Sequence, residues 1–146
     1  MKVKFMKSIY PALCFAFLLP AAVFAEDISG VLPSKRTIYF PWMSVIDWEK
    51  MHAEDSVVAQ YDQVDLLFIG DSITAGWDWH VWQKYFSPLK AANFGIGGDH
   101  TGNLLWRLQH GAIGNMQPKV IVLLIGVNNF GHLYETPDQV AAGINK

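Results

Sequence analysis

Three short motifs in this 146-residue sequence carry groups that could catalyse acyl transfer. Ser72, within Gly-Asp-Ser-Ile-Thr at residues 70–74, directly follows an apolar run and could present its hydroxyl as a nucleophile. Gly98 ends the glycine-rich stretch 95–98, where the missing Cβ allows an oxyanion to approach a peptide N–H closely. Asn128 follows a third apolar run, and its side-chain amide can donate a hydrogen bond to developing negative charge.

Each motif also has an ordinary structural interpretation. A serine here could cap a helix, a glycine-rich stretch could form a tight turn, and an asparagine could form an Asx turn or a cap. The stretch 95–98 does not fit a dinucleotide fingerprint, because His100 stands where the third glycine is required. Together the motifs favour a site, because each follows an apolar run and ligands bind at the carboxyl ends of parallel strands.

The elements that must position these motifs alternate between strand and helix patterns. Short apolar runs at residues 64–69, 91–94 and 119–125 are typical of buried parallel strands. Helical spacing of apolar residues separates them, ending at Phe86 in the first interval and covering residues 101–110 in the second. Alternating strands and helices imply parallel pairing through right-handed crossovers, so the predicted fold class is an α/β sandwich.

Two further helices are predicted at the flanks of this pattern. Ser44 and Asp47 form a capping box before one of them, and its apolar face includes His52 as an interfacial side chain rather than a ligand. Thr136 begins the other, with proline at the first position and glutamine three residues after the cap. This helix has no C-cap signal before Lys146, so we expect the chain to be an N-terminal portion of a longer domain.

The first 25 residues have the pattern of a secretory signal peptide. Three lysines precede the apolar stretch Ile9–Leu19, and small residues precede a cleavage site after Ala25. An uncleaved membrane anchor is the alternative, but the apolar stretch is at the lower limit of what spans a bilayer. We therefore expect a secreted or periplasmic protein with a signal at 1–25, an irregular arm at 26–43 and a folded domain from 44–146.

Composition excludes several other classes of protein. The chain is 51% apolar and 16% charged, which argues against a disordered or collagen-like protein. After the leader, 8 basic and 13 acidic side chains give a net charge of −5, so nothing favours nucleic acid or a membrane surface. Cys14 falls within the leader, which leaves no disulfide and no thiol nucleophile. No cluster has metal-ligand spacing, so neither a metal nor a cofactor is expected.

The sequence resembles the SGNH (GDSL-type) hydrolases over roughly Val64 to Ile144, through DLLFIGDSIT, VWQKYFSPLKAANFGIGGD, LLWRLQHG and PKVIVLLIGVNN. Within that family it is most similar to the catalytic subunits of platelet-activating-factor acetylhydrolase and their bacterial relatives. The resemblance implies a three-layer flavodoxin-like fold, of which strands four and five are missing here. It also implies that Ser72 is the nucleophile. The backbone N–H groups of Ser72 and Gly98, with the Asn128 side chain, would form the oxyanion hole.

One block of the family pattern is absent. The family's base is a histidine three residues after an aspartate, and this sequence contains no such pair. Asp78 and His80 have the wrong spacing. We expect His132 to lie in a loop, and His100 and His110 to face solvent. The chain as given is therefore expected to be inactive alone.

We predict a secreted serine esterase or lipase-like hydrolase that cleaves short-chain or acetyl esters through an acyl-serine intermediate. Its partner would be a small-molecule or glycan ester. A carbohydrate O-acetylesterase and a non-catalytic secreted binding domain are the alternatives. Trp77, Trp79 and Trp82 either line an acyl or sugar pocket or fill the core. Residues 120–125 are expected to form an unpaired apolar sheet edge.

Overall fold

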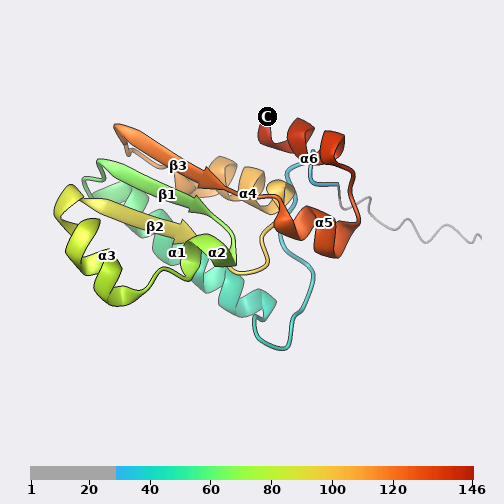
Figure 1. Ribbon diagram of the computed structural model, residues 1–146, viewed down its shortest axis with the longest axis horizontal. Helices are drawn as coiled ribbons and strands as arrows, with labels where there is room; N and C mark the ends of the chain where they lie inside the picture. The colour runs from blue at the N-terminus through green and yellow to red at the C-terminus, as the bar shows by residue number, and fades with distance from the viewer. Residues whose placement is uncertain (1–28) are drawn as a thin grey trace, which may run out of the picture.

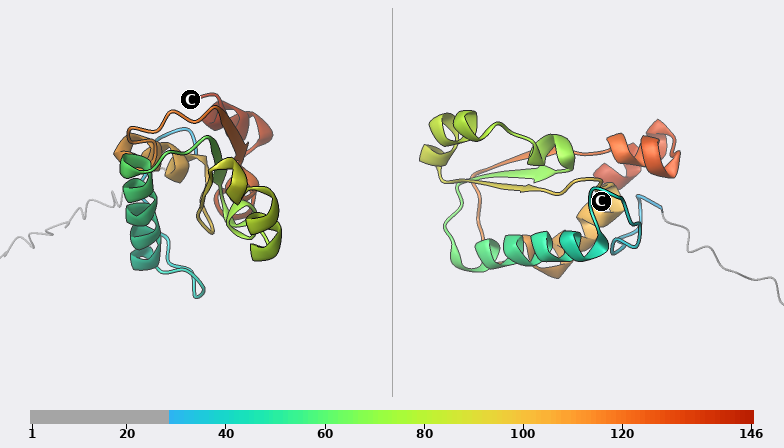
Figure 2. Two further views of the ribbon diagram at one scale, coloured as in Figure 1. Left: turned by 90° about the vertical axis from the view of Figure 1, so that its left-hand side faces the viewer. Right: turned by 90° about the horizontal axis from the view of Figure 1, so that it is seen from below.

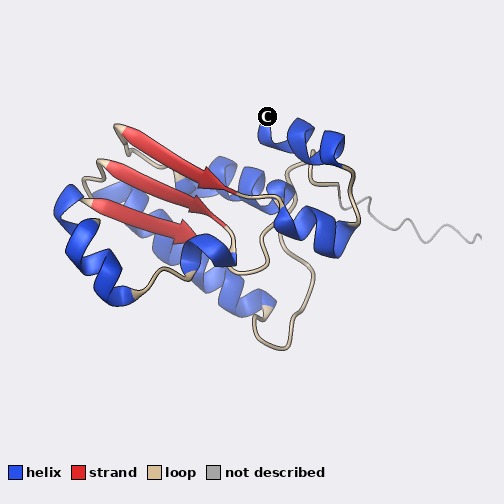
Figure 3. Ribbon diagram, viewed as in Figure 1, coloured by secondary structure: helices blue, strands red, loops and turns tan. Residues whose placement is uncertain are grey.

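The computed structural model describes residues 29–146, and the predicted signal at residues 1–25 lies outside them. Three short strands form one parallel sheet within this part. They are β1 (Leu66–Gly70), β2 (Ala91–Gly95) and β3 (Val120–Leu124), in the spatial order β2-β1-β3 (Figure 1). Helices lie on both faces of the sheet (Figure 3), which confirms the predicted α/β fold with parallel pairing.

The register of the strands brings their carboxyl ends to a common edge. Gly70, the last residue of β1, pairs with Gly95 of β2 and with Leu124 of β3. The arrowheads of all three strands point toward the side of the molecule that holds the short helices after β1 and β3 (Figure 1). The three motifs that follow the strands therefore begin at one edge of the sheet.

The helical layer on one face is made of three segments (Figure 2). They are α1 (Val45–Tyr61), α4 (Thr101–Arg107) and the π turn η2 (Leu108–Ala112). The predicted capping box begins α1, because Ser44 Oγ accepts from Asp47 N at 3.0 Å and the Asp47 carboxylate accepts from Ser44 N at 3.2 Å. The core between this layer and the sheet contains Ala59, Val64, Leu67, Ile69, Phe94, Leu104, Ala112 and Met116.

The helix predicted over residues 101–110 is regular only in its first part. Regular α-helix ends at Arg107, and the chain continues as the π turn to Ala112. Gly111 adopts a φ of +115° there, and a Cβ at this residue would lie 3.0 Å from Ser56 Oγ on α1. Glycine therefore fits this position both for its conformational freedom and for its close approach to α1.

An aromatic layer covers the other face of the sheet. It is carried by α2 (Ser72–Ala75), α3 (Trp79–Tyr85) and the 3-10 turn η1 (Ser87–Leu89). Phe68 of β1 makes edge-to-face contacts with Trp77, Trp82 and Phe86 at centroid distances of 6.0, 5.2 and 4.9 Å. These contacts place Trp77 and Trp82 in packing against the sheet.

The last strand has a partner on only one side within the described residues. β3 pairs with β1, and its side chains from Val120 to Leu124 are 39–54% exposed. The predicted apolar sheet edge is therefore present. Two helices follow, α5 (Val127–Leu133) and α6 (Pro137–Ile144), the latter after the predicted capping box of Thr136. No helix among residues 29–146 is both long and apolar enough to cross a membrane.

Candidate active site

Ser72 is the first residue of α2, immediately beyond the end of β1. The carboxylate of Asp71 caps this helix by accepting a hydrogen bond from Ile73 N at 2.9 Å. Because Asp71 performs the capping, Ser72 is not needed for that role, and its side chain is exposed. A Cβ at Gly70 would overlap the carbonyl oxygen of Leu124, so the turn into α2 requires glycine there. The exposed Ser72 hydroxyl is available to a substrate.

Burial affects the carboxylate next to this serine. Asp71 is almost fully buried, and its Oδ2 atom has no hydrogen-bond partner among the described residues. Burial raises the pKa of Asp71, while the hydrogen bond from Ile73 N opposes that effect.

Gly98 lies in the turn that joins β2 to α4. Its φ is +76°, in the left-handed region that favours glycine. A Cβ at this position would lie 2.9 Å from Phe40 Cε2 and 3.0 Å from atoms of both Arg36 and Trp42. The turn therefore needs glycine for conformation and for space. Gly98 can therefore both form a tight turn and offer its backbone N–H as a donor, so the two interpretations of this stretch are compatible.

Asn128 lies near the start of α5 and contacts the same turn. Its Nδ2 atom donates to the backbone carbonyl of Asp99 at 2.7 Å, next to Gly98. A side-chain amide carries two N–H donors, so one remains for another acceptor. The structure thus brings Asn128 to the Gly98 turn, although 29 residues separate Asn128 from Asp99. Ser72, Gly98 and Asn128 follow three adjacent strands at one edge of the sheet.

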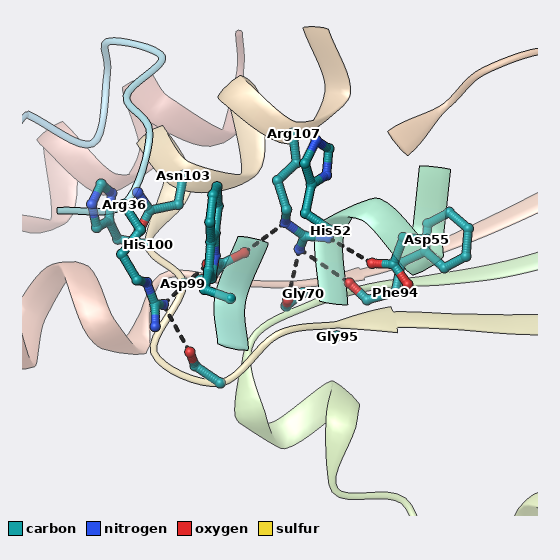
Figure 4. Close-up of polar contacts among 12 residues, drawn as sticks. Arg36, His52, Asp55, Gly70, Phe94, Gly95, Asp99, His100, Asn103 and Arg107 are labelled. Carbon is teal, nitrogen blue, oxygen red and sulfur yellow. Dashed lines mark hydrogen bonds and ion pairs between the residues drawn. The ribbon is translucent and has the colours of Figure 1, made fainter. Parts of the chain in front are cut away.

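A buried charge cluster, which the sequence did not predict, supports the Gly98 turn. Asp99 is fully buried, and three side chains donate to its carboxylate (Figure 4). Arg107 Nε donates to Oδ2 at 2.8 Å, while Trp48 Nε1 and Arg36 Nη2 donate to Oδ1 at 2.6 and 3.1 Å. Burial raises the pKa of Asp99, and the two guanidinium groups and the indole N–H oppose that rise.

Arg107 connects this cluster to the ends of two strands. Its Nη2 atom donates to the carbonyls of Phe94 and Gly70 at 3.0 and 3.3 Å, and Nη1 donates to Asp55 Oδ2 at 3.2 Å (Figure 4). Burial raises the pKa of Asp55 to about 7 despite the Arg107 charge. The sequence feature that could have indicated this cluster is an arginine among the apolar residues of α4, because an arginine that is fully buried requires charged or polar partners.

A second buried polar cluster fixes the start of α5. Asn129 Nδ2 donates to Thr101 Oγ1 at 2.6 Å and to Glu135 Oε2 at 2.8 Å, and its Oδ1 accepts from Thr101 N at 3.1 Å. Glu135 Oε1 also accepts from Gly30 N at 2.6 Å. These bonds join the N-terminal arm, α4 and α5. Asn129 therefore positions the backbone beside Asn128, which the sequence did not indicate.

Two predictions about histidine are wrong. His100 does not face solvent: its side chain is 3% exposed, and Nδ1 accepts from Gly102 N at 3.1 Å as the cap of α4. Burial lowers the pKa of His100 to about 4, with a further contribution from the Arg36 charge. His132 lies in helix α5 rather than in a loop, and its ring makes a tilted contact with Phe40 at a centroid distance of 4.7 Å.

His110 and His52 lie where the sequence predicted, and neither supplies a base. His110 is exposed, and its Nδ1 contacts the carbonyl of Trp106 at 2.7 Å. His52 is interfacial, with Nε2 3.1 Å from the carbonyl of His110. No hydrogen bond found within residues 29–146 joins a histidine to Ser72. Over the same residues, no group of three or more histidine, cysteine, aspartate or glutamate side chains is arranged to hold a metal ion.

Comparison with known proteins identifies the family. A model of the GDSL-like Lipase/Acylhydrolase family matches residues 68–145, more than half of the chain. The chain belongs to this family. The three candidate motifs after β1, β2 and β3 all lie within the matched range, whereas the N-terminal arm and α1 precede it.

Two similar proteins from other organisms are named as acetylhydrolase subunits. It is 43% identical over 98 residues to platelet-activating factor acetylhydrolase IB subunit alpha2 of Gallus gallus, covering 66% of this chain and 42% of the relative. It is 40% identical over 98 residues to subunit alpha1 of Bos taurus, covering 66% of this chain and 41% of that one. The chain thus spans about two fifths of the length of these curated relatives.

A solved structure also shares the fold of this GDSL-family chain. It is that of a Streptococcus pneumonia protein provisionally named a platelet activating factor, with a TM-score of 0.53 and 28% sequence identity. The match covers 71% of this chain and 49% of the other. The similarity agrees with the parallel three-stranded sheet and its two helical layers.

Proposed function

We propose that this chain carries the nucleophile and the oxyanion hole of a serine ester hydrolase of the GDSL type. The proposal depends mainly on one observation. Ser72 begins the helix after β1, while Asn128, after β3, donates a hydrogen bond beside Gly98, after β2. A nucleophilic hydroxyl and hydrogen-bond donors from adjacent strands thereby share one edge of the sheet, where ligands of parallel sheets bind.

In the proposed reaction, Ser72 Oγ attacks the ester carbonyl and the carbonyl oxygen becomes an oxyanion. The N–H groups of Ser72 and Gly98, and the free N–H of the Asn128 amide, would donate to that oxygen. A base takes the proton of Ser72 and returns it to the departing alcohol, which leaves an acyl-enzyme. Water then attacks the acyl carbonyl, the bond between the acyl group and Ser72 Oγ breaks, and the carboxylic acid leaves with the serine regenerated.

We further propose that residues 29–146 alone turn over very slowly. None of the hydrogen bonds found among them connects Ser72 to a histidine, and His100 is buried, neutral at pH 7 and engaged as a helix cap. In a comparable triad, loss of the histidine lowers turnover by about six orders of magnitude. The oxyanion hole would still bind the developing charge, so the residual rate would depend on Asn128.

The proposed substrate class is a short-chain ester, with acetyl esters first. The support for it is that two similar relatives are named acetylhydrolases. A carbohydrate ester has less support, because neither relative's name points to one and because Trp77 and Trp82 use part of their surface to pack on Phe68. Trp77 and Trp79 are 43% and 66% exposed.

The kinetic test uses the protein expressed from its complete reading frame and aryl esters of increasing acyl length. Ser72→Ala should abolish hydrolysis of aryl acetate, and Asn128→Ala should lower kcat by roughly two to three orders of magnitude. Ser87→Ala, in the turn before β2 at the opposite end of the sheet, is the matched control and should keep wild-type activity. Near-wild-type activity of Ser72→Ala would show that the nucleophile assignment is wrong.

A further inference from the structure

The N-terminal arm contacts the glycine turn that carries the proposed oxyanion donor, although it lies before the family match at residues 68–145. Arg36 makes the principal polar contact. Its side chain is 3% exposed, and its Nη2 atom donates to the carbonyl of Gly97 at 2.7 Å and to Asp99 Oδ1 at 3.1 Å. One guanidinium nitrogen is therefore hydrogen-bonded to the residues on both sides of Gly98. Figure 4 shows the bond between Arg36 and Asp99.

The bond to Gly97 fixes the orientation of the proposed N–H donor. The Gly97 carbonyl and the Gly98 N–H belong to the same peptide group, which is planar and trans. In a trans peptide the C=O and the N–H point in opposite directions. Because the carbonyl points at Arg36, the Gly98 N–H must point away from Arg36, and the arginine thereby sets the direction of the donor.

This peptide would be easy to rotate without such a restraint. Both of its flanking residues are glycine, so no Cβ opposes rotation of the peptide between two orientations. Phe40 and Trp42 lie within 3.0 Å of the position that a Gly98 Cβ would occupy, so their apolar rings crowd the Cα of this residue. The hydrogen bond from Arg36 is the polar contact that distinguishes the two orientations.

The charge on Arg36 also affects the strength of the donor. A guanidinium remains charged in proteins, and a charged donor on a carbonyl polarises the peptide group beyond it. Polarisation of the Gly97 carbonyl makes the Gly98 N–H a stronger donor to an oxyanion. Arg36 itself is held in place by Asp99 and by the faces of Phe40 and Trp48, at 5.4 and 5.9 Å from the ring centroids.

We propose that Arg36 is a positioning residue for the oxyanion hole, which orients and polarises the peptide between Gly97 and Gly98 so that its N–H meets the transition state. This inference rests on the proposed esterase function. It assigns a role in that function to the N-terminal arm, which supplies no residue to the proposed chemistry itself.

The experiment compares Arg36→Met and Arg36→Lys with Lys35→Met in the protein expressed from its complete reading frame. Lys35 is the matched control because it is adjacent and exposed and pairs with Glu49 at the surface. We expect Arg36→Met to lower kcat for aryl acetate by about ten- to a hundredfold, a part of what loss of a whole donor costs, with KM unchanged. Arg36→Lys should recover part of that loss, and Lys35→Met should stay within about twofold of wild type.

A second measurement separates this inference from the proposed function. The amide signal of Gly98 in ¹⁵N-labelled protein should shift in Arg36→Met and remain in place in Lys35→Met. An inactive wild type would overturn the proposed function, and the Gly98 signal alone would then decide whether Arg36 orients this peptide. Unchanged kcat in Arg36→Met, or an unchanged Gly98 signal, would overturn the positioning role. If Arg36→Met fails to fold, Arg36→Lys decides by the same two readouts, since it keeps the charge beside Asp99.

Discussion

Replacing Arg107 by methionine should destabilise the protein far more than a surface substitution of the same kind. Methionine keeps much of the length and apolar volume of arginine but removes every hydrogen bond of the guanidinium. Four acceptors lose a donor: Asp99 Oδ2 at 2.8 Å, Asp55 Oδ2 at 3.2 Å, and the carbonyls of Phe94 and Gly70 at 3.0 and 3.3 Å.

The size of the loss follows from what these acceptors retain. Gly70 O still accepts from Ile96 N at 3.1 Å, and Asp99 still has Trp48 and Arg36 on its other oxygen. The main cost is the loss of one of two cations from a fully buried carboxylate. Breaking a buried ion pair from one side costs about 3 to 5 kcal/mol. Because Asp99 keeps partners, we expect a decrease of about 3 kcal/mol in the free energy of unfolding.

Urea unfolding followed by tryptophan fluorescence measures this change, with Lys119→Met as the matched control. The distance from Lys119 Nζ to Asp65 Oδ2 is 3.0 Å, similar to the 2.8 Å from Arg107 Nε to Asp99 Oδ2, but the Lys119 and Asp65 side chains are 75% and 36% exposed. Exposed ion pairs are worth less than about 1 kcal/mol. If Arg107→Met is destabilised no more than Lys119→Met, then the buried cluster does not stabilise the strand ends.

Three further results are expected. As the pH falls from about 6.5 to about 4, His100 becomes protonated in the unfolded chain but not in the folded chain, so the wild type should lose more stability over that range than His100→Asn, which keeps a cap acceptor. If urea unfolding shows the same change of stability with pH in both proteins, this prediction is wrong. Val122→Lys, at the centre of the exposed β3 edge, should reduce concentration-dependent association of residues 29–146 in light scattering, and unchanged association would place the contact elsewhere. Intact-mass measurement of the exported protein should give a chain beginning at Glu26, whereas a product retaining Met1 in the membrane fraction would contradict cleavage.

The sequence predicted well those features that depend on neighbouring residues. Apolar runs gave the three strands to within about two residues, and local capping chemistry placed the starts of α1 and α6. The common edge of the three motifs then followed from the general behaviour of parallel sheets, whereas the strand order β2-β1-β3 came from the structure. Ser72 and Asn128 could be placed at one sheet edge because each follows a strand directly.

The sequence did not reveal contacts between residues far apart in the chain. Arg36 and Asp99 are 63 residues apart, and Arg107 and Asp55 are 52 apart, so no local pattern connects them. The sequence predicts His100 at the surface because it flanks a helix, but the folded chain buries it to 3% exposure. The charge cluster is therefore a product of the fold, and it could be inferred only from a charged residue within an apolar helix face.

Trapping the acyl-enzyme is the most direct test of the central claim that Ser72 attacks an ester. The protein from the complete reading frame is mixed with an aryl acetate, quenched in acid within the first turnover and digested for mass spectrometry. We predict an acetyl group on Ser72 in the wild type and none on the corresponding peptide of Ser72→Ala. Acetylation at another residue, with Ser72 unmodified during active turnover, would contradict the account.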